Sequence, residues 1–166
     1  MGLFDVFKSE PPKLTARLAL PAGLLYMMAS DGEIEAEEIG QLQSVVGGDQ
    51  ELVNTAIKYL RSVKYEQFLV DAAAILSEQQ KMCVLINMAD SLLSDGRAEQ
   101  SEQIAFGKAL AQFGITEDRF KPYFEAIAIK NNRSIFWNKS LAKILGHKSD
   151  AQGWQKSMNT FLAMPA

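Results

Sequence analysis

The chain has 166 residues, of which 48% are apolar, so it is long enough to bury a core of its own. Its single cysteine, Cys83, excludes an intramolecular disulfide and any CxxC zinc or redox pair, and it favours a reducing, cytoplasmic setting. The net charge of −3 hides an asymmetry, because residues 1–129 carry 19 acidic and 11 basic residues whereas residues 130–166 carry one and six. The sequence therefore predicts an acidic body followed by a basic tail.

The first residues are more apolar than a solvated terminus requires. Residues 1–8 contain four large apolar side chains beside Asp5 and Lys8, namely Leu3, Phe4, Val6 and Phe7. Pro11-Pro12 then interrupts any helix. Two interpretations stay open. The segment docks on the body, or it touches a membrane surface, although eight residues are too few for stable membrane binding on their own.

Apolar residues recur at helical spacing through a domain predicted at residues 13–130. The first helix is expected over residues 13–30 with a break near Leu20, because Pro21 removes a hydrogen-bond donor. The second is predicted over about 35–46, with Val45 facing inward. We expect a third to begin at an Asp49 N-cap.

A fourth helix is predicted over residues 65–76. The spacing of Ser77 and Gln80 is that of a capping box and starts the fifth helix, where Cys83 is expected to be a small buried side chain. The sixth, over about 99–112, is expected to bury Ile104.

Thr116 is predicted to open the seventh helix, with Ile129 in its inner set. Pro122 lies past the first turn, so a tight turn is expected there ahead of the regular helix. No stretch of residues 13–130 shows the sustained alternation of a strand. The sequence therefore predicts an all-α bundle of about seven helices, followed by a basic tail at residues 131–166 that is partly helical.

One acidic stretch occurs twice, 64 positions apart. Residues 29–38 are Ala-Ser-Asp-Gly-Glu-Ile-Glu-Ala-Glu-Glu, and residues 93–102 are Leu-Ser-Asp-Gly-Arg-Ala-Glu-Gln-Ser-Glu. Each copy joins an apolar helical segment to an acidic one through an Asp-Gly turn. This internal duplication predicts that the bundle is built from two helical hairpins.

In both copies a glutamate follows the aspartate by seven residues, which pairs Asp31 with Glu38 and Asp95 with Glu102. If the duplication brings both turns to one side of the bundle, these four carboxylates offer oxygen ligands to Ca²⁺ or Mg²⁺. The alternative is that they only cap helices, because free amide groups and the helix dipole favour acids there. The sequence alone leaves both interpretations open.

The hairpins also carry a family resemblance. An apolar helix ending in Ala-Ser-Asp31-Gly32, an acidic continuation at Glu37-Glu38, and a second Leu-Ser-Asp95-Gly96 hairpin that leads to Gly114 together resemble the TerB family of tellurite-resistance proteins. The TerB-like domain that precedes the J-domain of a membrane-anchored co-chaperone is similar as well. The resemblance covers roughly residues 20–125.

The resemblance implies a compact all-helical domain with a role in stress or tellurite resistance. It also implies that Asp31, Glu38, Asp95 and Glu102 are the acidic residues suspected of binding a metal. Arg97 departs from the pattern beside the second turn and favours the Asp31 side if only one pocket binds a cation. The tail after residue 130 lies outside the family core.

Features of catalysis are lacking in the sequence. One histidine and one cysteine leave no Ser-His-Asp or Cys-His arrangement, and no Gly-rich phosphate loop occurs. We therefore predict a non-enzymatic interaction or scaffold protein that has a protein partner and no cofactor beyond a divalent cation. Nucleic acid is not expected, because the acidic body repels phosphates. The alternative is an adaptor of a membrane-associated or secretion assembly that uses residues 131–166.

Overall fold

The computed structural model describes residues 10–29, 34, 36–94 and 100–132, and all regular secondary structure in this part of the chain is helical. Its helices are α1 (Ala16–Met28), α2 (Ala36–Val45), α3 (Gln50–Ser62), α4 (Tyr65–Ile75), α5 (Glu78–Leu93), α6 (Gln100–Gln112) and α7 (Glu117–Asn131). The prediction of an all-α bundle of about seven helices is confirmed. Both Asp-Gly turns, residues 1–9 and the tail from residue 133 lie outside the described residues.

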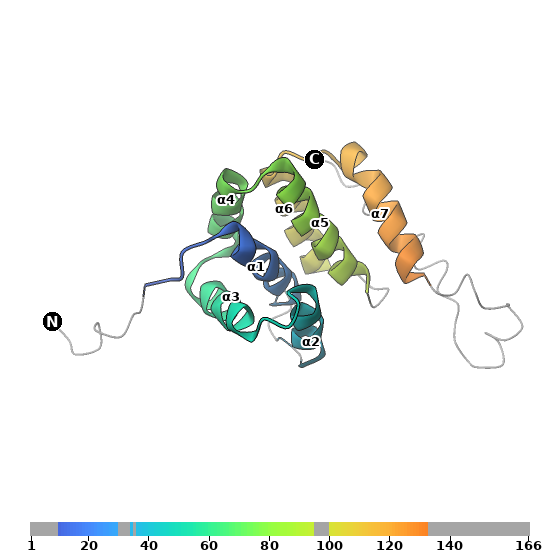
Figure 1. The fold of residues 1–166 in the computed structure, drawn as a ribbon. Coiled ribbons are helices and arrows are strands. Elements are labelled where there is room, and N and C mark those ends of the chain that lie inside the picture. Colours follow the sequence, from blue (N-terminus) through green and yellow to red (C-terminus); the bar gives the residue numbers. More distant parts are fainter. Residues whose placement is uncertain (1–9, 30–33, 35, 95–99, 133–166) are drawn as a thin grey trace, which may run out of the picture.

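Helix α1 forms the centre of the bundle and packs against α2, α3, α4, α5 and α6 (Figure 1). Nine of its 13 residues are buried, and they are distributed around the whole helix. A helix that is apolar all round is buried on every side. The apolar run at the end of the first predicted helix thus marks the core of the domain.

The three helices α1, α2 and α3 recur as α5, α6 and α7, with α4 as the connection. Helix α3 packs on α1, and α7 packs on α5 in the same way. Helices α2 and α6 also end in the same turn. The N–H of Gly48 donates to the carbonyl of Gln43 at 2.8 Å, and that of Ile115 donates to the carbonyl of Leu110 at 3.0 Å. The duplicated unit is therefore a helical triplet, one helix longer than the predicted hairpin.

Side-chain caps confirm three predicted helix starts. The carboxylate of Asp49 accepts from the N–H of Leu52, and the hydroxyl of Thr116 does the same for α7. The capping box at Ser77 and Gln80 is formed in both directions. These positions fix where α3, α5 and α7 begin.

Both prolines that were expected to disturb helices lie inside continuous ones. Helix α1 runs through Pro21, so the predicted break near Leu20 is wrong. Helix α7 begins at Glu117 and runs through Pro122 without a separate turn. Pro21 is itself buried in α1, and burial between several helices offsets the hydrogen bond that a proline removes.

Three apolar residues that were predicted to face inward are exposed, by 41% for Val45, 48% for Ile104 and 66% for Ile129. On α6 the buried residues start at Phe106, and a step of two residues from Ile104 turns the side chain to the opposite face. By the same argument, Ile129 lies on the face of α7 opposite the buried Ile127. The choice of face was wrong for these residues although the helices themselves were right.

A cluster of aromatic rings joins α1, α3 and α4. The hydroxyl of Tyr26 donates to the carbonyl of Val63 at 2.6 Å, and its ring stacks on Phe68 with centroids 5.0 Å apart. The hydroxyl of Tyr65 donates to a carbonyl of α6 at 2.7 Å. Burial raises the pKa of the Tyr26 and Tyr65 phenols. The hydroxyl of Tyr59 is buried without a hydrogen-bond partner among the described residues.

Candidate functional site

Helices α1 and α5 lie side by side and run in the same direction (Figure 1). One pocket near their starts is lined by Ala16 and Leu20 of α1 together with Gln80 and Val84 of α5. Ala16 precedes Gln80 by 64 positions and Leu20 precedes Val84 by 64 positions, which is the spacing of the sequence repeat. Equivalent positions of the two repeats therefore face each other.

The close approach of these two helices depends on a glycine in α1. A Cβ added at Gly23 would lie 3.1 Å from Cγ1 of Val84 and 3.6 Å from the sulfur of Met88. Normal contacts between carbon atoms begin at ~3.5 Å. The absence of a side chain at Gly23 lets α5 pack directly on the backbone of α1.

The ends of α1 and α5 meet at a second pocket, of about 370 Å³. Met28, the last residue of α1, and Ser94, the residue after α5, both line it. Apolar and hydrogen-bonding side chains are mixed in its walls, among them Leu24, Gln41 and Asn87. We call this the hairpin end of the bundle, because the chain continues from here into both acidic turns.

An ion pair that the sequence gave no reason to expect closes one side of the hairpin end. The carboxylate of Asp90 on α5 accepts from Nζ of Lys130 at 2.5 Å and from Nδ2 of Asn131 at 2.8 Å. These two donors are at the end of α7. The basic tail thus begins at a point where α7 is already tied to α5.

Of the four predicted metal ligands, the structure describes two. Glu38 lies in the first turn of α2 and Glu102 in the first turn of α6, and both are half-buried. Asp31 and Asp95 lie outside the described residues. Among the described residues, no three carboxylate, histidine or cysteine groups come together as a metal site. The four-carboxylate site stays a prediction.

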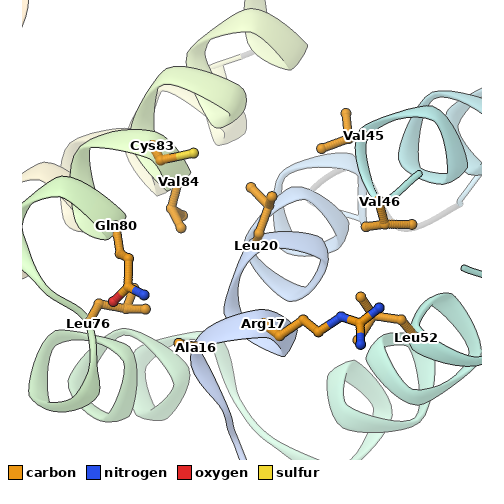
Figure 2. Close-up of a pocket in the computed structure, with 10 residues that line it drawn as sticks. All are labelled: Ala16, Arg17, Leu20, Val45, Val46, Leu52, Leu76, Gln80, Cys83 and Val84. Atoms are coloured by element: carbon orange, nitrogen blue, oxygen red, sulfur yellow. The ribbon is translucent and has the colours of Figure 1, made fainter.

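The pocket at the other end of α1 and α5 is an apolar groove of about 260 Å³ (Figure 2). Leu20 of α1 and Val45 of α2 face each other across it, and Val46 and Leu52 border it on the side of α3. Among the described residues that line it, Arg17 is the only charged one, and its guanidinium is paired with Asp49 at 2.6 Å. We call this site the apolar groove.

Cys83 lines the apolar groove and is exposed, so the prediction that it is buried is wrong. The buried face of α5 includes its neighbours Val84 and Leu85, and Cys83 lies just beyond the edge of that face. Figure 2 shows its sulfur pointing toward the space between α5 and α2. The thiol is accessible from the groove.

Comparison with models of known families, with curated proteins and with solved structures finds no match to this chain. None of the described helices combines the length and the apolar character that a membrane span requires.

Proposed function

We propose that this chain is a non-enzymatic interaction module of the TerB type, and that it binds a protein partner at the hairpin end under the influence of Ca²⁺ or Mg²⁺. The observation that carries the proposal is the parallel packing of α1 and α5. Because Met28 and Ser94 line one pocket, both repeats enter their acidic turns from the same end of the bundle. The stress or tellurite-resistance setting rests on the family resemblance alone.

The described glutamates fit a role in cation binding. Glu38 and Glu102 occupy the first turns of the helices that follow the acidic turns, and each follows the aspartate of its repeat by seven residues. Carboxylate oxygens are the ligands that Ca²⁺ and Mg²⁺ prefer. The excess of eight acidic residues in residues 1–129 further favours a cation over an anion.

The hairpin end also suits a peptide partner. Leu24 and Met28 supply an apolar base, while Gln41, Ser44 and Asn87 supply donors and acceptors around it. Such a mixture buries an apolar side chain and satisfies the backbone next to it. A cation bound in the adjacent turns would fix the rim of this surface.

The test is a titration of the ¹⁵N-labelled protein with CaCl₂ and, separately, with MgCl₂, followed by amide NMR. We expect shifts around Asp31 and Glu38 that disappear in the Asp31→Ala/Glu38→Ala double variant. The matched control is Glu117→Ala/Asp118→Ala, which removes two acids from the first turn of α7 and should leave the response intact. Absence of any shift at millimolar cation would refute the cation clause.

A further inference from the structure

The apolar groove corresponds to a corner that the second repeat fills with its own side chains. The shared turn after α2 and α6 places Gly48 where the second repeat has Ile115, and Val46 where it has Phe113. Phe113 and Ile115 are both buried in the core, exposed by only 3% each. This type of turn usually includes an apolar contact from the residue that Gly48 replaces. The first repeat therefore has a smaller apolar side chain, Val46, in the lining of the groove and no side chain at Gly48.

The dimensions of the groove favour side chains as its occupant. Its volume of about 260 Å³ lies below the ~300–1,000 Å³ of typical small-molecule sites. Apolar side chains dominate the walls, and Arg17, the one cation among the described lining residues, is already paired with Asp49. One or two large apolar side chains from a peptide segment would replace what the second repeat supplies from Phe113 and Ile115.

We propose that the N-terminal segment, residues 1–9, occupies the apolar groove with one or two of the side chains Leu3, Phe4, Val6 and Phe7. The segment joins the described chain at Glu10, and Ala16 and Arg17 already line the groove. Residues 10–15 extend at most ~20 Å from Ala16, and the seven residues from Glu10 back to Leu3 span at most ~24 Å, so Leu3 and Phe4 can return to the groove. The covalent link supplies a local concentration in the millimolar range.

This proposal concerns the start of α1 and α5, whereas the proposed cation-dependent surface lies at their other end. Val45, at the end of α2, borders both pockets, but the other residues named for the two sites differ, so either proposal can fail without the other. The groove proposal assigns the segment a defined role: it completes the first repeat in the way that Phe113 and Ile115 complete the second. A partner that competes for the groove would displace it.

Cys83 provides a direct reporter, because it is the only thiol of the chain and lies in the groove. The experiment measures the rate at which iodoacetamide alkylates Cys83 in the full-length protein. A segment docked in nine of ten molecules leaves a tenth of them open, so Phe4→Asp/Phe7→Asp should raise the rate about tenfold. Both substitutions lie outside the described helices. The same change in the tail, Phe161→Asp, is the control and should leave the rate unaltered.

A second pair of variants tests the groove itself. Val45 and Val70 are exposed by 41% and 49%, but only Val45 lines the groove. Val45→Asp should accelerate alkylation of Cys83, and Val70→Asp should not. Equal rates for the wild type and Phe4→Asp/Phe7→Asp would overturn the proposal. Protection that is lost on dilution would overturn it in favour of a second copy, and protection lost on adding phosphatidylglycerol vesicles would overturn it in favour of a membrane role.

Discussion

Replacing Gly23 with valine tests the parallel packing of α1 and α5. The new Cβ would lie 3.1 Å from Val84 and 3.6 Å from atoms of Met88 and Phe68, and two further methyl groups would extend from it. Overpacking of this kind costs about 1–3 kcal/mol. The better helix propensity of valine returns about 0.5 kcal/mol. We therefore expect Gly23→Val to lower the free energy of unfolding by about 0.5–2.5 kcal/mol.

Gly107→Val is the matched control, because it makes the same change in a helix where, apart from the helix's own backbone, no atom of the described residues lies within 4 Å of the added Cβ. Only the propensity term applies there, so this variant should gain about 0.5 kcal/mol. The assay is urea unfolding followed by far-UV circular dichroism, with the m-value as a check that the unfolding transition keeps its cooperativity. If both variants were equally stable, Gly23 would not lie at a close helix contact, and the parallel arrangement of the repeats would lose its main support.

Three further changes test the packing around the repeats. Tyr59→Phe should keep the free energy of unfolding or raise it by up to about 1 kcal/mol, because it removes a buried hydroxyl that has no hydrogen-bond partner among the described residues. Tyr26→Phe should lower it by about 1 kcal/mol through the lost bond to Val63, and the reverse order in urea unfolding would contradict this assignment. Ser77→Ala should lower the melting temperature by removing a cap worth about 0.5–2 kcal/mol, and an unchanged melting temperature would exclude that contribution. Burial raises the pKa of the Tyr26 and Tyr65 phenols, so the unfolded chain loses its phenolic protons at lower pH than the folded chain does, and the free energy of unfolding should fall as pH rises above about 10. A constant free energy of unfolding between about pH 9 and 11 would show that these phenols are not buried.

Much of the fold was predictable because helix starts have local chemical signals. Asp49, Ser77 and Thr116 cap through side chains only three residues away, and such contacts can be read from sequence spacing. The continuation of α1 through Pro21 was not predictable in this way. Its cost is local, but the burial that offsets it comes from the helices that pack on α1, which the chain brings together only in the folded state.

Some site residues could likewise be predicted from the sequence, and others could not. The repeat identified Glu38 and Glu102 as equivalent positions, and the structure places each in the first turn of its helix. The groove was missed, although one signal for it was present. Comparing Val46-Gly47-Gly48 with Phe113-Gly114-Ile115 shows that the first repeat has small residues where the second has large ones. The contact of Asp90 with Lys130 joins residues 40 positions apart and has no such signal.

The most direct test of the account uses Mn²⁺, a paramagnetic ion that takes the same oxygen ligands as Mg²⁺. It should be titrated into the ¹⁵N-labelled full-length protein at substoichiometric amounts while amide line widths are recorded. If both acidic turns lie at one end of the bundle and share a cation, amides at the starts of α2 and α6 will broaden together and at the same Mn²⁺ concentration. Broadening at neither start would contradict the account, and broadening at the start of α2 alone would replace the shared site by a single site on the Asp31 side.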